Sequence, residues 1–181
     1  MRELTEEEAT VLFKKLAHYT GRSLNNLIAP PEGENSERHV FRLQGSRVFY
    51  LPLRLANFAT SIPRANLLSA GTIIGKFTKT MKFRLHITAL SVISGHARYK
   101  VWIKPNGEMP FLYGGNVARW SEDCPEHSGV VVYSMNDEPL GFGVTARSTA
   151  EAKKLDPTGI VVFRQADAGE YLREEDSLFT T

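Results

Sequence analysis

Residues 71–90 read GTIIGKFTKTMKFRLHITAL, and this stretch decides how the first half of the chain is expected to fold. Apolar and polar residues alternate on both sides of a polar segment at 78–81, a pattern typical of two β-strands joined by a tight turn. The second strand is expected to turn one face to a core and the other to solvent. The inward side chains are expected to be Phe83, Leu85, Ile87 and Ala89, and the outward ones Lys82, Arg84, His86 and Thr88.

Positive charge is concentrated around this strand pair. Between residues 76 and 86 five side chains are Lys, Arg or His, and none is acidic. The wider stretch from Arg38 to Gly107 has 12 Lys and Arg residues in 70 positions and no Asp or Glu, although the whole chain has a net charge of only +2. Lys and Arg neutralise phosphate backbones, and nearby carboxylates would oppose such binding, so the pattern favours a polyanionic partner. The alternative is a solvated surface that is balanced by the acids clustered near both ends of the chain.

Length and composition fit one ordinary domain or two small ones. The chain has 181 residues, of which 42% are hydrophobic, enough to form a core. No apolar run approaches the length of a membrane span, and the first ten residues, MRELTEEEAT, have acids where a secretory signal has an apolar run. A single cysteine, Cys124, excludes an internal disulfide and a multi-cysteine zinc site. We therefore expect a soluble, intracellular protein.

The other signals in the first half predict an α+β domain. Thr5 and Glu8 form a capping box ahead of apolar residues at helical spacing, which predicts a helix over 5–20. Farther along, we expect a loop at 30–38, a hairpin turn at 44–46 and a second helix between Pro52 and Pro63.

The second half has a different pattern of apolar and turn-forming residues. The regular spacing of apolar residues is lost around 91–98, and we place a domain boundary there. This gives domains 1–93 and 94–181, the second of which ends in an acidic tail. Short apolar runs between turn signals are typical of a small barrel. The expected elements are strands in 99–105, 110–115, 129–134, 140–146 and 159–165, a turn at 105–107, and a short helix at 149–155.

No complete catalytic or cofactor motif is present in the sequence. The stretch 71–77 resembles a phosphate loop but has the wrong glycine spacing, and Phe77 stands where a Ser or Thr should hold magnesium. Cys124 and His127 lack a visible orienting partner, and the five histidines lack metal-type spacing. We therefore expect a binding protein with no catalytic residue, cofactor or metal.

Trp102 is open to two interpretations. Alternation along 99–104 places it between Lys100 and Lys104 on the outer face of a strand, where it could stack on a nucleic-acid base. Alternatively, Trp102 packs on the core of the second domain or between the two domains.

Five long blocks of the sequence resemble the Nip-seven family of eukaryotic 60S ribosome-subunit biogenesis factors. They read MRELTEEEATVLFKKLAHYTG, GKFTKTMKFRLHITAL, ARYKVWIKPNGEMPFLYG, GVVVYSMNDEPLGFGVTARST and GIVVFRQADAGEYLREEDSLF, and together they span nearly the whole chain. The resemblance implies an N-terminal α/β pre-PUA domain with a mostly antiparallel sheet, followed by a PUA pseudo-barrel, a small RNA-binding fold. One departure is that the segment after FLYG is shorter than the family pattern, which puts RNA contact by 116–120 in doubt.

The resemblance also implies a function, partners and a location. It implies a non-enzymatic nucleolar factor, partly cytoplasmic, that binds pre-rRNA of the 27S/25S–28S region and acts in 27S processing. The implied protein partners are pre-60S assembly factors, a nucleolar rRNA cytosine-5 methyltransferase and the exosome, with no membrane. The residues expected to contact RNA are Lys76, Lys79, Lys82 and Arg84 in the first domain, Lys100 and Lys104 at the junction, and Arg147, Lys153 and Lys154 in the second. For Arg147 the alternative is an ion pair with Glu151 or Asp156.

Two further functions remain open from the sequence. The first is a protein–protein adaptor that reaches the pre-60S particle through a partner, with RNA contact secondary. The second is an RNA-modifying enzyme, which only the PUA association favours. A steep salt dependence of RNA affinity would distinguish the RNA-binding factor from the adaptor.

Overall fold

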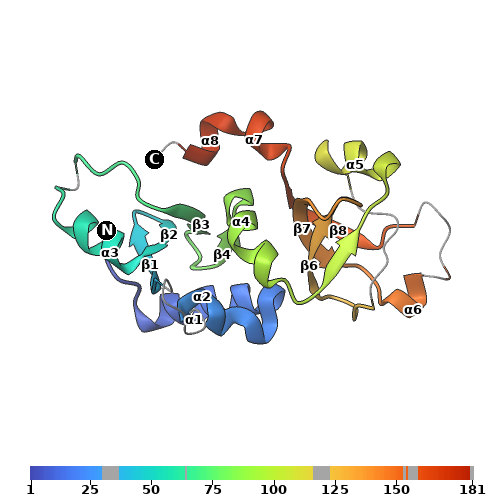
Figure 1. Cartoon of the computed structure of the whole chain (residues 1–181), viewed down its shortest axis with the longest axis horizontal. Coiled ribbons are helices and arrows are strands. Elements are labelled where there is room, and N and C mark those ends of the chain that lie inside the picture. The colour runs from blue at the N-terminus through green and yellow to red at the C-terminus, as the bar shows by residue number, and fades with distance from the viewer. Residues whose placement is uncertain (30–36, 64, 116–122, 153, 155–158, 180–181) are drawn as a thin grey trace.

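The structure, a computed structural model, describes residues 1–179 except 30–36, 64, 116–122, 153 and 155–158 (Figure 1). Most of the expected loop at 30–38, the shortened segment at 116–120, Lys153 and the expected helix stop at 156–157 lie outside the described residues. The α+β class is confirmed, because a helical segment and an antiparallel four-stranded sheet precede a second, mixed four-stranded sheet. No helix in the described ranges is long and apolar enough to cross a bilayer.

The first sheet has the order β1-β2-β3-β4 and is antiparallel throughout. The predicted first helix, hairpin and second helix are confirmed as α1, β1–β2 and α3. The elements are α1 (Glu6–Thr20), η1 (Gly21–Ser23), α2 (Leu24–Ile28), β1 (His39–Gln44), β2 (Arg47–Pro52), α3 (Leu53–Thr60), β3 (Thr72–Phe77), β4 (Phe83–Leu85), η2 (Ile87–Ala89), α4 (Leu90–Ile93) and η3 (Ser94–His96).

The capping box of α1 also anchors the N-terminal segment to the sheet. Glu8 accepts hydrogen bonds from the Thr5 backbone N–H at 2.9 Å and from both terminal nitrogens of Arg2 at 2.8 and 2.7 Å. The Arg2 backbone pairs in both directions with Leu43 of β1. The Arg2 guanidinium holds the pKa of Glu8 at about 2, assisted by the Thr5 N–H, although partial burial opposes this.

The predicted second strand of the opening stretch is shorter than expected. Strand β4 ends at Leu85, and the chain then turns into η2, where the Ala89 N–H donates to the His86 carbonyl. The Thr88 hydroxyl donates to the Ile73 carbonyl, which buries Thr88 against the neighbouring strand. The expected outward position of Thr88 is therefore wrong, and His86 is half-buried, whereas Lys82 and Arg84 are exposed as predicted.

The second sheet has the order β5-β6-β7-β8, in which β5 and β6 are parallel and the other pairs antiparallel. Four of the five expected strands and the short helix α6 are present. The elements are β5 (Lys100–Trp102), α5 (Pro105–Leu112), β6 (Gly129–Tyr133), β7 (Pro139–Thr145), α6 (Thr149–Ala152), β8 (Val162–Asp167), α7 (Glu170–Arg173) and α8 (Glu175–Phe179).

The expected turn at 105–107 and strand at 110–115 are wrong, because α5 occupies this segment. Pro105 stands in the first turn of the helix, where its missing N–H costs no helical hydrogen bond. Asn106 and Gly107, which signalled a turn, occupy the same first turn, where the Gly107 N–H donates to the carbonyl of the N-cap residue Lys104 at 2.8 Å. Phe111 is buried in the core of the second domain and holds the helix against the sheet.

The two sheets are joined by one hydrophobic core. The ring of Tyr19, at the end of α1, meets Phe142 of β7 edge-on with centroids 5.4 Å apart, and its hydroxyl donates to Gln165 of β8. After β8 the chain returns as α7 and α8 over the first domain, where Leu178 is buried in the same core (Figure 1). The shared core fixes the surfaces of the two domains relative to each other.

Candidate nucleic-acid interface

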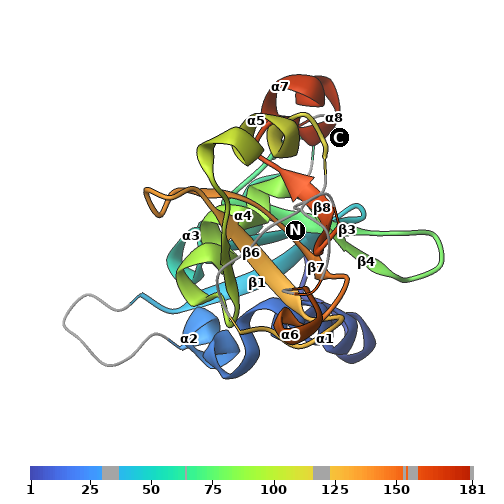
Figure 2. The same cartoon turned by 90° about the vertical axis from the view of Figure 1, so that its right-hand side faces the viewer.

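The hairpin of β3 and β4 carries four of the predicted RNA-contacting residues. Its turn is held by the Thr78 N–H, which donates to the Lys82 carbonyl at 2.8 Å, and by the Lys82 N–H, which donates to the Thr78 hydroxyl at 3.1 Å. Gly75 permits the close approach of the two strands, because a Cβ there would lie 2.0 Å from the Arg84 carbonyl oxygen. The hairpin projects from the body of the molecule (Figure 2).

Three cations lie side by side across neighbouring strands. Arg47 of β2 faces Lys76 of β3, and Lys76 faces Arg84 of β4. We call Arg47, Lys76 and Arg84 the cationic row. Like charges directly opposite each other destabilise a sheet, so this row is maintained at a cost to stability.

The row and the turn together form the candidate interface, which we call the cationic hairpin surface: Arg47, Lys76, Lys79, Lys82 and Arg84. The last four are exposed, and within the described residues they have no ion-pair partner. The N-terminal acids Glu3 and Glu8 pair instead with Arg42 and Arg2. This geometry favours the polyanion interpretation over internal neutralisation for these four residues.

Arg47 was missed by the sequence prediction. It follows the β1–β2 turn, so only the register of β2 against β3 shows that it borders Lys76. Arg47 also donates to the Leu178 carbonyl at 3.5 Å, which links one end of the row to the C-terminal segment. A prediction that β2 pairs with β3 could have placed Arg47 beside Lys76.

The pKa of His86 responds to the positive charges of the cationic row. Burial, and then the positive charges of Lys76 and Arg47, lower its pKa to about 4. Its Nδ1 atom is buried and has no hydrogen-bond partner among the described residues. His86 is therefore neutral at physiological pH and adds no charge to the surface.

The pKa of His86 gives a prediction about acid stability. The folded-state pKa is below the ordinary value of 6.5, so the unfolded state takes up a proton first as the pH falls. Stability is expected to be unaffected by this group above pH 6.5 and to decline between pH 6.5 and about 4. Replacing His86→Asn should flatten this part of the curve of unfolding free energy against pH. An unchanged slope in the variant would contradict the assigned pKa.

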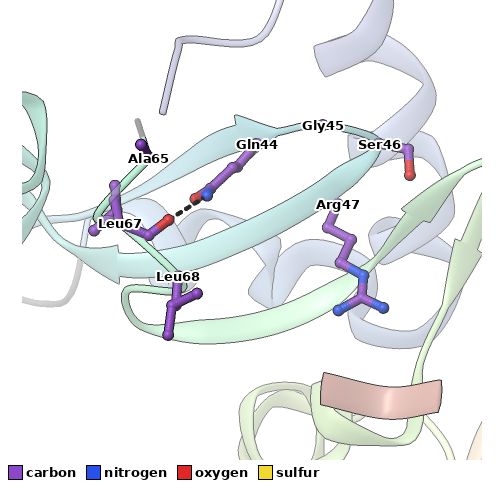
Figure 3. A pocket seen from close by; sticks show the side chains of 7 residues that line it. All are labelled: Gln44, Gly45, Ser46, Arg47, Ala65, Leu67 and Leu68. Atoms are coloured by element: carbon purple, nitrogen blue, oxygen red, sulfur yellow. Dashed lines mark hydrogen bonds between the residues drawn. The ribbon is translucent and has the colours of Figure 1, made fainter. Parts of the chain in front are cut away.

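A pocket of about 420 Å³ lies beside the cationic row (Figure 3). The β1–β2 turn and Arg47 form one side, and Leu67 and Leu68 form the other. The Gln44 amide donates to the Leu67 carbonyl at 2.7 Å across the pocket floor. The pocket thus places apolar side chains next to Arg47, one end of the row.

The predicted cations of the second half that the structure describes lie on β5, at the start of α5 and beside α6. Lys104 is exposed at the start of α5, and Lys100 lies with its Nζ 5.4 Å from the centre of the Tyr133 ring. Arg147 and Lys154 are exposed on either side of α6, which both views place away from the β3–β4 hairpin (Figures 1 and 2). Among the described contacts no ion pair joins Arg147 to Glu151, and Asp156 lies outside the described residues.

Trp102 has a packing role. Its ring stacks on Tyr133 with centroids 6.0 Å apart, and its Nε1–H donates to Asp137 at 2.6 Å. It also packs against the core shared by the two domains. These contacts support the second of the two interpretations.

The described residues do not assemble the catalytic pair considered for Cys124. The Cys124 side chain is buried, whereas His127 is exposed and lies 3.6 Å from Glu126. The part of the chain that the structure describes also contains no group of three or more His, Cys, Asp or Glu side chains able to hold a metal ion.

Comparison with protein families matches both halves of the chain. Residues 1–87 match the NIP7/UPF0113 pre-PUA domain, and residues 99–176 match the UPF0113 PUA domain. The chain belongs to the NIP7 family. The resemblance seen in the sequence is thereby confirmed, and with it the order of a pre-PUA domain followed by a PUA domain.

Full-length relatives of this NIP7 chain are found in fungi and animals. It is 60% identical over 186 residues to the "60S ribosome subunit biogenesis protein NIP7" of Saccharomyces cerevisiae, covering 99% of this chain and 100% of that protein. It is 58% identical to the protein of that name from Schizosaccharomyces pombe and 51% identical to the Xenopus tropicalis homologue, with 98% or more of this chain covered in each case.

Solved archaeal structures share the fold at low sequence identity. A PUA-domain protein from Aeropyrum pernix K1 has a TM-score of 0.58 at 15% identity, covering 98% of this chain and 91% of that one. A hypothetical protein from Pyrococcus horikoshii OT3 also has a TM-score of 0.58, at 14% identity, covering 95% and 96% of the two chains. These likenesses support the NIP7 fold only.

Proposed function

We propose that this protein is a 60S ribosome-subunit assembly factor that binds pre-rRNA through the cationic hairpin surface. The observation that carries the proposal is the exposure of four hairpin cations that have no ion-pair partner in the described residues. The names of the full-length relatives support the pre-60S context. The mechanism is binding without turnover: Lys and Arg release counterions from rRNA and stabilise one rRNA conformation.

The finer parts of the proposal follow from family membership. We propose a role in 27S pre-rRNA processing, a nucleolar location, and contacts with pre-60S factors that include an rRNA cytosine-5 methyltransferase and exosome components. In the PUA domain, Lys100, Lys104, Arg147, Lys153 and Lys154 are proposed as secondary RNA contacts. We also propose the domain division at 93/94, which falls in the stretch between the two family-matched ranges.

The salt dependence of RNA affinity tests the proposal. If about four to five phosphates are neutralised, affinity for a 25S rRNA fragment should fall roughly 100-fold between 50 and 200 mM salt. Filter binding or fluorescence anisotropy across this range gives the slope. A nearly flat dependence would reject binding through the hairpin cations. It would favour the protein–protein adaptor, for which the exposed apolar side chains of α3 would provide a binding surface.

A further inference from the structure

Helix α3 packs on the first sheet through its smallest side chains. Ala56 and Ala59 are each only 2% exposed, and Ala56 packs in a cluster with Phe49, Leu51 and Ile73. Three large apolar side chains of the same segment are exposed instead: Leu55 by 41%, Phe58 by 64% and Ile62 by 43%. This is the reverse of the burial pattern that a helix serving only the core would show.

The three large side chains share one side of the helix. Leu55 and Phe58 are three residues apart, so they are neighbours on the helix surface. Ile62 follows in the turn that continues α3, where its N–H donates to the Ala59 carbonyl. We call Leu55, Phe58 and Ile62 the α3 outer face. A group of large apolar side chains exposed together on a folded domain marks an interaction site.

Two arginines flank this apolar face. Arg54 is exposed on α3 itself, and Arg38 is exposed at the helix start, where its carbonyl accepts from the Leu53 N–H at 2.8 Å. Neither has an ion-pair partner among the described residues. Helix α3 contains no acid and lies within the stretch from Arg38 to Gly107 that has none. The face therefore offers apolar contacts with positive charge at one end.

The α3 outer face is separate from the cationic hairpin surface. Helix α3 lies over β1 and β2 at one end of the molecule, whereas the β3–β4 hairpin projects elsewhere in both views (Figures 1 and 2). The two surfaces can therefore be occupied at the same time.

We propose that the α3 outer face binds an acidic amphipathic helix of a partner protein. The apolar side of such a helix would cover Leu55, Phe58 and Ile62, and its carboxylates would pair with Arg54 and Arg38. RNA fits less well, because only one of the three apolar side chains is aromatic and can stack on a base. A second copy of the chain fits less well, because the face supplies no carboxylate for the arginines of the other copy. The inference does not depend on RNA binding by the hairpin.

Photo-crosslinking in cells tests this proposal. The full chain would carry p-benzoylphenylalanine in place of Phe58, with a second sample labelled at Lys79 in the hairpin for comparison. We expect the label at position 58 to attach to a protein segment that is acidic and amphipathic. Attachment to RNA, to a second copy, to a segment of other composition, or to nothing would overturn the proposal.

A binding measurement with purified components completes the test. A synthetic peptide of the crosslinked segment should bind the full chain, and Phe58→Ser should weaken this binding at least about tenfold, as expected for a central aromatic contact. Arg54→Glu should also weaken it, whereas Asn57→Ala, exposed on the same helix, should not. The thermal midpoint and RNA affinity of the Phe58→Ser chain should match those of the parent, which separates this proposal from the RNA-binding one. Equal peptide affinity for parent and Phe58→Ser would overturn it.

Discussion

Replacing Asp167→Ala is expected to destabilise the protein by about 3 kcal/mol, because it removes the centre of a buried ionic network. Asp167 is completely buried at the end of β8 and accepts hydrogen bonds from Arg164 at 2.7 Å and Arg173 at 2.9 Å. It also accepts from the Gly169 N–H at 2.9 Å, where the chain enters α7. Without the carboxylate, this N–H loses its acceptor, and each arginine loses one of its acceptors.

The other acid of the network cannot replace Asp167. Glu170 accepts from Arg164 at 2.7 Å, but its pKa is raised, first by burial and then by the negative charges of Glu174 and Asp167. Arg173 also donates to the Leu112 carbonyl, so the network links α7 to the end of α5. Its loss should therefore loosen the segment that carries Leu178 into the shared core.

Thermal unfolding measures this effect. A loss of about 3 kcal/mol should lower Tm by roughly 6–12 °C in a chain of this size. Asp167→Asn, which retains one acceptor oxygen, should fall between Ala and the parent. Glu138→Ala, an exposed acid in the neighbouring turn, should change Tm little. A shift for Asp167→Ala as small as that of Glu138→Ala would show that the network contributes nothing to stability.

Local signals were sufficient for most elements of the fold. The capping box of α1, the two-residue turn between β1 and β2, and the polar turn of the β3–β4 hairpin each depend on residues close together in the chain. The exceptions have a common cause. The helix at 105–112 is accompanied by burial of Phe111 in the second core, and the early end of β4 by the hydrogen bond from Thr88 to Ile73. Both depend on partners that the sequence does not reveal.

The candidate site was predictable in part for the same reason. Lys76, Lys79, Lys82 and Arg84 belong to one hairpin, so sequence proximity implied spatial proximity. Arg47 joins them only through strand register. The predicted cations Arg147 and Lys154 lie beside α6, away from the hairpin (Figures 1 and 2). The acids near the C-terminus were interpreted as a tail, but one of them, Glu170, is buried and pairs with Arg164.

Reversing two charges of the hairpin, Lys79→Glu with Arg84→Glu, is expected to weaken RNA binding at least about tenfold at 100 mM salt. Each change removes one phosphate contact, so the salt slope should fall by about 2. Both residues are exposed, which makes a loss of folding an improbable source of the effect. The test is filter binding of an rRNA fragment at several salt concentrations, together with thermal unfolding of the same samples.

The matched control is Lys14→Glu with Arg22→Glu, which changes the net charge equally on exposed positions of α1 and η1. If long-range charge alone governed binding, both double variants would bind RNA equally weakly, and the assignment to the hairpin would fail. The stability of the hairpin variant adds an independent criterion. Arg84 faces Lys76 directly, so an introduced carboxylate should replace repulsion by attraction and stabilise the fold by about 0.2–1 kcal/mol. A variant that is more stable and binds RNA less would show that the cationic row is retained for binding at the expense of stability.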